Sequence, residues 1–567
     1  MPSASMAFLQ ALQEAGVSHV FANWGSDHPA LLEAAAEARE TGRTLPELVT
    51  APNEMVALSA AHGHALASGR PQAVIVHVDC GTQALGGAVH NAMRARVPVL
   101  IFAGAAPFTQ DGELFGARNE FIHWLQDVRD QRGIVRPYMK WDGEVRTGRN
   151  IAQMTWRALQ MAQSAPQGPV YLMGAREVME ETVPEGAASP LSYGTPSPRA
   201  LDEASVATIL ADLTRAARPL IVTSYAGRKG GAVARLVALC EAFGAGVLES
   251  APSAMNFPAD HSLYQGAQWN QPAQNEALAS ADFVLVLDSD VPWIPSVNRP
   301  ADGAVVRHID IDPLKKDIPL WAIPAASRHE ADCETALYQL LSRAPALDPD
   351  LVSRRRAHWE GLAQARQKSL AAREERQPTL TAEHLTARIA AHWGEDAIVL
   401  NEGISHYHVI GDGMRRTKPG TLFTSGSSSL GWSGGAAIGV KLARPDARVA
   451  ALCGDGSYLF SIPATVHWMA RHCRTPFLQV VYNNQGWKSP KLSTLALHPH
   501  GYAARANDMG VRFEPPADYA GIAEAAGGAL ALRVRTPDQA DEALSRALHA
   551  VEVERRCAVI DAVLPAL

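Results

Sequence analysis

Short apolar runs, each about the length of one β-strand, recur along the whole chain and constrain its fold more than any other feature. They alternate with helical patterns in three successive blocks. Runs that are apolar at nearly every position are typical of strands buried on both faces, as in parallel sheets covered by helices. We therefore predict an α/β protein with three doubly wound parallel-sheet domains. The runs are HVFANW, AVIVHV, PVLIFAG and GPVYLMG in the first block, RPLIVTSYAG, AGVLES, DFVLVLDSD and AVVRHIDIDP in the second, and AIVLNEG, GTLFTSG, RVAALCGDG, PFLQVVYNN and CAVIDAVL in the third.

The joints between the blocks give the expected domain boundaries. With 567 residues the chain is too long for one hydrophobic core. The stretch VPEGAASPLSYGTPSPRA has the composition of a loop, and the charged stretch SRRRAHWEGLAQARQKSLAAREERQP reads as a connecting helix with a solvated charged face. We place the domains at 1–188, 198–345 and 375–567, and expect the first and third to be related.

Composition and charge exclude several classes of protein. The net charge of -7 gives no reason to expect nucleic-acid binding. The six cysteines lack metal-type or disulfide-type spacing, as in a reducing compartment. The N-terminal segment lacks the features of a signal peptide, and the apolar runs are too short to span a bilayer. We expect a cytoplasmic protein with no membrane association.

The stretch from Gly454 to Trp487 combines Gly-Asp-Gly after one strand with Asn-Asn at the end of the next. Glycines and free N–H groups at a helix start let an anion approach, but Asp455 would repel a phosphate. A divalent cation between the two resolves the conflict, since Mg²⁺ prefers carboxylate, amide, carbonyl and phosphate oxygens. Asn483 or Asn484 would add an amide oxygen and Gly486 a backbone carbonyl. The pattern predicts a metal–diphosphate anchor.

Gly-Asp-Gly followed by Asn-Asn resembles the motif of thiamine diphosphate-dependent enzymes, in the group of acetolactate synthases, 2-hydroxyacyl-CoA lyases and benzoylformate decarboxylases. The resemblance covers nearly the whole chain. It extends to VTAPNEMVALSAAHGHALASGRP, SAPQGPVYLMGAREV, ADFVLVLDSD with HIDIDP, and SGSSSLGWSGGAAIGVKLARPD. It implies thiamine diphosphate and Mg²⁺ as cofactors, and domains in the order pyrimidine-binding, middle and diphosphate-binding.

The resemblance also assigns roles to cofactor-binding residues. Asp455, Asn484 and the Gly486 carbonyl match the Mg²⁺ ligands; Asn483 stays an alternative to Asn484, because the spacing is slightly longer than in relatives. Glu54 matches the glutamate that hydrogen-bonds the aminopyrimidine ring and activates the cofactor. Leu430 matches the apolar residue beneath the bent cofactor. The remaining cofactor-binding positions implied are Ser405, His406, Ser428, Gly454, Gly456 and Ser457.

Substrate-side residues are implied by the first domain. FANWGSDHP places Ser26, and VIVHVDCGTQ places His77, at pocket positions of benzoylformate decarboxylase. A histidine there can move protons near neutral pH. Gln126 lies near the glutamine that carboligating relatives place over the thiazolium ring, with Gln131 and His123 as alternatives for that position.

Departures from the family pattern narrow the prediction. The chain has no adjacent His-His pair, unlike pyruvate decarboxylases. After NNQGW, Lys488 and Lys491 are candidates for lining the entrance together with Trp487. FAD or ADP is not indicated in the middle domain, where the loop with Trp293 and Arg299 either touches a nucleotide or caps a strand.

These observations predict a lyase or carboligase of the 2-hydroxyacyl-CoA lyase type, acting on a 2-keto acid, an aldehyde or a 2-hydroxyacyl-CoA. Acetolactate synthase is the first alternative and a benzoylformate-type decarboxylase the second. A non-catalytic thiamine diphosphate-binding protein is an alternative of another class. A dinucleotide-dependent dehydrogenase is disfavoured, because no G-x-G-x-x-G turn follows the first strand. The family assembles as homodimers or homotetramers, so we expect active sites between subunits.

Overall fold

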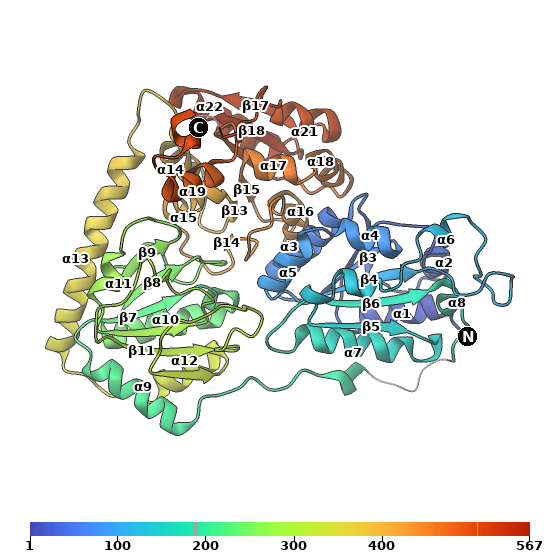
Figure 1. Ribbon diagram of the computed structural model, residues 1–567, viewed down its shortest axis with the longest axis horizontal. Helices are drawn as coiled ribbons and strands as arrows, with labels where there is room; N and C mark the ends of the chain where they lie inside the picture. The colour runs from blue at the N-terminus through green and yellow to red at the C-terminus, as the bar shows by residue number, and fades with distance from the viewer. Residues whose placement is uncertain (185–189, 507–508, 567) are drawn as a thin grey trace.

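Three parallel six-stranded sheets, each covered by helices, form the protein (Figure 1). The computed structural model describes residues 1–184, 190–506 and 509–566. Every strand pairing within the three sheets is parallel, so the predicted three-domain α/β fold is confirmed. The apolar runs are indeed the strands, because such runs bury side chains on both faces of each sheet.

The first sheet has the strand order β2-β1-β3-β4-β6-β5. Its strands are β1 (His19–Ala22), β2 (Glu47–Thr50), β3 (Gln72–Val76), β4 (Val99–Ala105), β5 (Trp141–Val145) and β6 (Val170–Ala175). Its helices are α1 (Ala4–Glu14), α2 (Pro29–Thr41), α3 (Glu54–Ser68), α4 (Val78–Ala84), α5 (Ala88–Arg94), α6 (Ile122–Leu125), α7 (Ile151–Gln163) and α8 (Arg176–Met179).

The middle sheet has a different order, β12-β11-β10-β7-β8-β9. Its strands are β7 (Pro219–Thr223), β8 (Gly246–Ser250), β9 (Tyr264–Gln268), β10 (Phe283–Leu287), β11 (Val305–Asp310) and β12 (Ser327–Glu330). Its helices are α9 (Glu203–Arg215), α10 (Gly230–Phe243), α11 (Glu276–Ser280) and α12 (Cys333–Ser342).

The third sheet, β14-β13-β15-β16-β18-β17, repeats the order of the first, as expected of related domains. Its strands are β13 (Ile398–Glu402), β14 (Leu422–Phe423), β15 (Val449–Gly454), β16 (Leu478–Asn483), β17 (Leu530–Val534) and β18 (Ala558–Val563). Its helices are α14 (Ala382–His392), α15 (Tyr407–Met414), α16 (Ser433–Ala443), α17 (Asp455–Phe460), α18 (Pro463–His472), α19 (Lys488–Leu497), α20 (Tyr502–Ala506), α21 (Tyr519–Gly527) and α22 (Ala540–Glu552).

The predicted connecting helix is α13 (Pro349–Glu374), which runs along the edge of the molecule from the middle to the C-terminal domain (Figure 1). Asp350, Arg354, Lys368 and Arg373 are exposed as expected, but Arg355 is buried. Its guanidinium donates to the carbonyls of Phe243 at 2.9 Å and Thr214 at 2.8 Å. Arg355 therefore anchors α13 to the middle domain.

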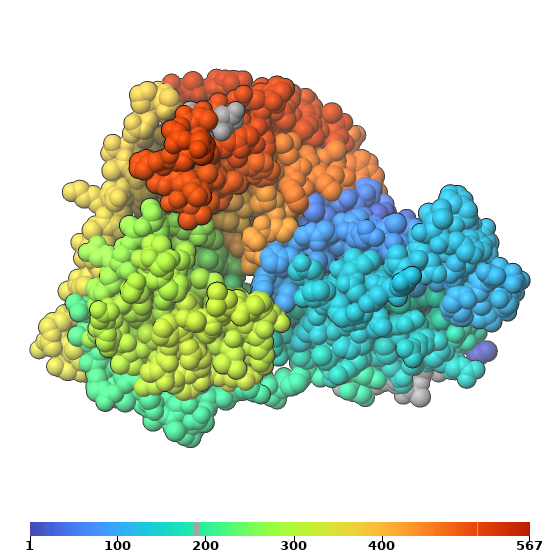
Figure 2. Space-filling view, in the orientation of Figure 1, coloured from blue at the N-terminus to red at the C-terminus, as the bar shows by residue number. Residues whose placement is uncertain are grey.

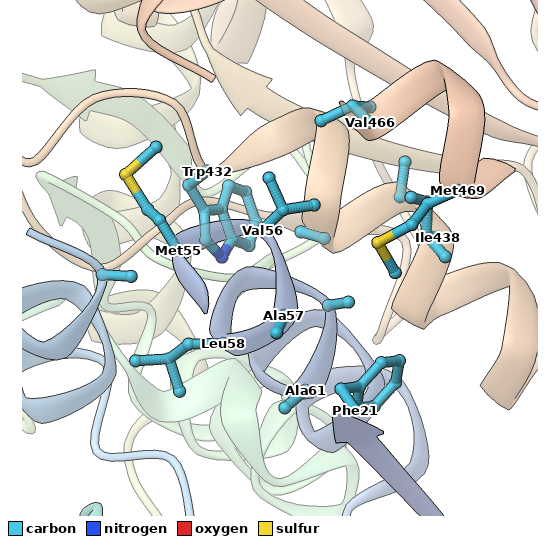
Figure 3. Packing of buried hydrophobic residues seen from close by; sticks show 14 of the residues in the cluster. Phe21, Met55, Val56, Ala57, Leu58, Ala61, Trp432, Ile438, Val466 and Met469 are labelled. Atoms are coloured by element: carbon cyan, nitrogen blue, oxygen red, sulfur yellow. The ribbon is translucent and has the colours of Figure 1, made fainter. Parts of the chain in front are cut away.

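The N-terminal and C-terminal domains meet where α3 packs along α16 (Figure 3). Both helices are rich in small residues, so their backbones approach closely. A Cβ added to Gly439 would lie 1.9 Å from the Ala60 carbonyl oxygen, and one added to Gly63 would lie 2.3 Å from the Ala436 oxygen. Trp432 fills the end of this interface beside Met55 and Val56 (Figure 3). A side chain at either glycine would force the domains apart.

The three domains surround a central region in which each contacts the other two (Figure 2). Over the described ranges, no helix has both the length and the apolar character to cross a membrane.

Candidate active site

Each sheet has a crevice at its carboxyl edge, between two strands whose connections run in opposite directions. Such switch points are where open parallel sheets bind ligands. In the C-terminal sheet the crevice lies between β13 and β15, and in the N-terminal sheet between β1 and β3. In the middle sheet it lies between β7 and β10. Most residues singled out in the sequence follow the strands that flank the two outer crevices.

Asp455 lies at the end of β15, almost completely buried. Its Oδ1 accepts the Gly456 N–H at 2.8 Å, and its Oδ2 accepts the Gly486 N–H at 2.9 Å. Burial raises the pKa of this carboxyl group to about 6, against the effect of these backbone bonds. The side chain is thereby fixed against the loop that follows β16. It also occupies one of the N–H groups that the sequence suggested for an anion.

The two asparagines after β16 differ in their hydrogen bonds. Asn483 is used structurally: its Nδ2 donates to Asp561 Oδ1 at 2.8 Å, and its Oδ1 accepts the Gln485 N–H at 3.1 Å. The Asn484 Oδ1 is buried and has no hydrogen-bond partner among the described residues. A buried unpaired amide oxygen costs about 1–3 kcal/mol unless a ligand satisfies it. The donor set therefore fits an oxygen-liganded cation at Asp455 and Asn484.

Neighbouring groups complete this turn. The Ser457 Oγ is also buried and unpaired within the described part of the chain. Gly456 has no room for a side chain, because a Cβ there would lie 2.2 Å from the Trp487 ring. Gly486 has a φ of +152°, a backbone region that favours glycine. Trp487 thus covers the Gly454–Ser457 turn, and Lys488 begins α19 beside it.

The other predicted cofactor positions lie around the same crevice. Ser405 and His406 follow β13, and burial lowers the pKa of His406 to about 3, so its ring is neutral. The loop of Ser428 and Leu430 precedes α16. Between them, the Ser429 backbone forms two hydrogen bonds with the Asn91 side chain of α5, at 2.9 and 3.1 Å. The N-terminal domain therefore holds this loop in place.

Glu54 is the first residue of α3 and is buried. Its Oε1 accepts the Asn23 Nδ2–H at 2.9 Å, while Asn53 caps the helix by accepting the Val56 N–H. A Cβ on Gly435 of α16 would lie 3.1 Å from the Val56 oxygen. We expect the cofactor to lie between Glu54 of one subunit and Asp455 of another, and this stays a prediction. Within one chain, the first turn of α3 packs on α16.

His77, directly after β3, contacts a carboxylate that sequence reasoning missed. Its Nδ1 bonds to Asp27 Oδ1, and His28 Nε2 lies 3.1 Å from Asp27 Oδ2. The hydrogen bond to Asp27 raises the pKa of His77 despite partial burial. Ser26, in the same loop, has a buried and unpaired Oγ within the described ranges. The acid–histidine pair after Ser26, in WGSDHP, was the available signal.

The three candidates for the residue near the thiazolium ring have different surroundings. Gln131 Nε2 donates to the Gly104 carbonyl at 2.8 Å and to Tyr171 Oη at 2.9 Å, so its amide is used structurally. His123 is buried beside Arg176, whose Nη1 lies 3.1 Å from its Nε2. Gln126 neighbours His77, and neither of its buried amide atoms has a well-formed partner in the part of the chain described. Of the three, Gln126 is the one whose amide lies beside His77 and is not held in a structural hydrogen bond within the described residues.

The middle crevice is filled by ion pairs. Arg96, from the N-terminal domain, lies 2.9 Å from Asp290 and 3.4 Å from Asp310. Burial would raise the pKa of Asp290, but the charges of Arg96 and Lys315 outweigh it and lower that pKa. The full set of carboxylates is Asp288, Asp290 and Asp310, and the cations are Arg96, Arg228 and Lys315.

The loop with Trp293 and Arg299 serves the middle domain itself. Trp293 is buried in the hydrophobic core of that domain. The Arg299 backbone exchanges hydrogen bonds with Gln274. The strand-capping alternative therefore fits this loop better than contact with a nucleotide.

These features define a class: a three-domain α/β protein whose C-terminal crevice presents oxygen ligands for a cation and whose N-terminal crevice presents a glutamate and a histidine. The N-terminal, central and C-terminal domains of thiamine pyrophosphate enzymes match residues 3–134, 206–321 and 404–562. The chain belongs to the thiamine diphosphate-dependent enzyme family.

Two relatives are each about one quarter identical to this chain in sequence. An acetolactate synthase large subunit of Lactococcus lactis is 26% identical over 471 residues, covering 80% of this chain and 76% of that protein. A benzoylformate decarboxylase of Pseudomonas aeruginosa is 27% identical over 496 residues, covering 85% and 86%. The chain is a thiamine diphosphate-dependent enzyme of the family that contains both.

Solved structures share the fold over the full length. The thiamine diphosphate-dependent 4-hydroxybenzoylformate decarboxylase of Rhodococcus jostii has a TM-score of 0.80 at 21% identity, covering 100% of this chain and 99% of that one. The benzoylformate decarboxylase of Polynucleobacter necessarius has a TM-score of 0.80 at 20% identity, covering 100% of both chains.

Proposed function

We propose that this chain is a thiamine diphosphate- and Mg²⁺-dependent lyase or carboligase that cleaves or forms a carbon–carbon bond next to a carbonyl or hydroxyl group. The observation that carries the proposal is the buried Asn484 amide oxygen, which has no partner among the described residues and lies near Asp455, whose carboxylate is fixed against the same loop. Asp455, Asn484 and the Gly486 carbonyl would hold the cation and, through it, the diphosphate.

When bound, thiamine diphosphate supplies a nucleophilic carbon and an electron sink for the bond being broken. The residues of the chain bind, orient and exchange protons. Glu54 would hydrogen-bond the aminopyrimidine from the start of α3, and Leu430 would support the cofactor from below. His77 would hold or release a proton at Nε2, the ring nitrogen that Asp27 leaves free. Gln126, beside His77, would orient the substrate with its amide.

The 2-hydroxyacyl-CoA lyase reaction is our first proposal within this class, with Lys488 and Lys491 as candidates for contacting the phosphates of a CoA ester. Acetolactate synthesis is the alternative that the Lactococcus relative supports. Decarboxylation of a benzoylformate-type 2-keto acid is the other alternative, supported by Ser26 and His77, which follow the two strands that flank one crevice.

A substrate panel tests these proposals. Purified protein with thiamine diphosphate and Mg²⁺ is assayed with pyruvate, benzoylformate and a 2-hydroxyacyl-CoA. The Glu54→Gln variant should lose turnover, and Glu37→Gln, an exposed carboxylate on α2, should keep it. Turnover of the CoA ester alone would support the first proposal. Acetolactate from pyruvate or benzaldehyde from benzoylformate would favour the alternatives, and tight cofactor binding without turnover would favour a non-catalytic binder.

We also propose a homodimer or homotetramer, supported by an apolar surface on the segment 108–128. Its exposed large side chains include Phe108, Phe115, Phe121 and Leu125. Large apolar side chains exposed together in one short segment mark a candidate contact with another protein chain. Gln126 lies in the same segment. A second subunit packed on this segment would therefore also cover the proposed substrate pocket. Sedimentation velocity should give a dimer or larger, and a monomer at micromolar concentration would refute this.

A further inference from the structure

Asp27 occupies the crevice between β1 and β3 as a fully buried carboxylate. One of its oxygens bonds to His77 Nδ1. The other accepts the Val78 N–H at 3.3 Å and lies 3.1 Å from His28 Nε2. A single acid thus contacts two histidines and the backbone that follows β3.

Two glycines leave the space that this carboxylate and His77 fill. A Cβ added to Gly104, in β4, would lie 1.5 Å from Asp27 Oδ2. A Cβ added to Gly25 would lie 2.0 Å from His77 Nδ1 and 2.5 Å from Asp27 Oδ1. Contacts under 3 Å are not tolerated, so two separate elements omit a side chain where the pair sits. The glycines at positions 25 and 104 therefore provide the space that the Asp27–His77 pair needs.

The hydrogen bonds assign a role to each nitrogen. His28 Nδ1 accepts the Gly25 N–H at 3.0 Å, so the proton of a neutral His28 is on Nε2, which lies 3.1 Å from Asp27 Oδ2 without hydrogen-bond alignment. The carboxylate takes the Nδ1 edge of His77, so Nε2 is the nitrogen left for the pocket. The His77 side chain is 19% exposed, whereas those of Asp27 and His28 are fully buried. The exposed edge of the cluster is therefore that of His77.

We propose that Asp27 is a positioning residue that orients His77 by its Nδ1 edge and compensates the charge of its protonated ring, so that Nε2 is the proton donor and acceptor of the reaction. This inference rests on the proposed function of His77. When Nε2 gives up its proton, one N–H bond breaks, one bond forms at the substrate, and imidazolium becomes imidazole beside an unchanged carboxylate. The reverse transfer restores the charge pair.

Other titratable groups around His77 bear on its charge. Asp79 and Cys80 lie on α4, and Asp79 also raises the pKa of His77, with a smaller effect than Asp27. Glu54 lies across Gly81, where a Cβ would be 2.9 Å from its Oε1 and 3.2 Å from His77 Cβ. Gln126 is neutral. Asp79→Asn is therefore the matched control for Asp27→Asn, since each removes one negative charge near the same ring.

The test measures the protonation of His77 directly. Full-length protein is treated with diethyl pyrocarbonate, which modifies neutral imidazole, across a pH series, and the His77 peptide is quantified by mass spectrometry. In wild-type protein we expect a midpoint above about pH 6.5, the value of an unperturbed histidine. Asp27→Asn should lower the midpoint by about 1–3 units, and Asp79→Asn by less.

Catalysis supplies the second measurement, on whichever substrate the panel identifies. Asp27→Asn should lower kcat by about 10²-fold, with little change in KM, and move the alkaline limb of the pH–rate profile to lower pH. An unchanged His77 midpoint in Asp27→Asn would overturn the pairing. A shifted midpoint with unchanged kcat would overturn its catalytic use.

Two further outcomes are distinguishable. If Asp27→Asn does not fold, the wild-type midpoint decides: a value at or below about 6.5 contradicts the charge pair. If wild-type protein turns over no substrate, the proposed function fails and the catalytic use of the pair fails with it. The reactivity of His77 then still decides whether Asp27 holds the ring charged.

Discussion

The C-terminal and middle crevices lie at equivalent places in two parallel sheets, yet their polar groups are satisfied in opposite ways. In the C-terminal crevice, buried oxygens of Asn484 and Ser457 lack partners within the described residues. In the middle crevice, Asp290 and Asp310 are paired with Arg96 from another domain. Buried oxygens without partners are available to bind a ligand. The paired charges of the middle crevice instead form a contact between two domains. The same topology therefore supports a cofactor site in one sheet and a structural contact in the other.

The largest expected effect comes from removing Arg96. Arg96→Ala leaves buried carboxylates undercompensated and should lower the free energy of unfolding by about 3–5 kcal/mol. Arg94→Ala is the matched control, because Arg94 makes one exposed bond, to the Asp317 carbonyl. Urea unfolding measures both. Equal stability of the two variants would contradict the assignment of the middle crevice as a structural joint.

The two adjacent asparagines should separate ligand binding from stability. Asn484→Ala should abolish the stabilisation by thiamine diphosphate and Mg²⁺, worth about 2.7 kcal/mol at a hundredfold excess over Kd. It should leave the free protein at least as stable as wild type, because it removes a buried oxygen that has no partner among the described residues. Asn483→Ala should destabilise the free protein by about 1–3 kcal/mol, because it removes a buried partner of Asp561. Thermal melts with and without cofactor measure both, and reversed behaviour would make Asn483 the ligand.

The ion pairs of the middle crevice should also set a pH dependence. Burial raises the pKa of Asp290, but Arg96 and Lys315 outweigh it, so the folded pKa is below the unfolded one. Their stabilising contribution is then present above about pH 4, the unfolded carboxyl pKa, and is lost as the pH falls through the folded pKa. The stability difference between wild type and Arg96→Ala should shrink over that range. A constant difference down to pH 3 would exclude charge pairing as its cause.

The smallest expected effect is the change in Tm when ADP or FAD is added. A cavity of about 480 Å³ adjoins Arg96 and Arg228, but both guanidinium groups are already paired with carboxylates. ADP or FAD would have to break those pairs, so neither should raise the Tm under conditions where thiamine diphosphate with Mg²⁺ does. An ADP-dependent rise in Tm that Arg96→Ala removes would show that the middle crevice opens for a ligand.

Much of the fold was predictable because buried strands of a parallel sheet need apolar side chains on both faces, which leaves a pattern in the sequence. AVIVHV and PFLQVVYNN, for example, became β3 and β16. The charged connector was predicted less well. Arg355 looks like its neighbours in sequence, but the carbonyls it binds belong to segments more than 100 residues away.

Some residues of the candidate site could be predicted from the sequence, and others could be chosen only from the structure. Gly454–Ser457 and Asn483–Asn484 are short-range motifs, so they could be found without coordinates. The choice between Asn483 and Asn484, and among Gln126, Gln131 and His123, depended on which polar atoms the rest of the fold had already paired. Asp27 was missed for the same reason, because its partner His77 lies 50 residues further on.

The sequence alone determined the family, the three parallel sheets and the positions of the strand-end motifs, since strand burial and cofactor chemistry both act on neighbouring residues. Only the tertiary structure decided which polar groups remain free, because hydrogen bonds and ion pairs form between distant segments. Arg96 closes the middle crevice from another domain, and Gly104 makes room for Asp27 from another strand. Both depend on three-dimensional packing that no local pattern records.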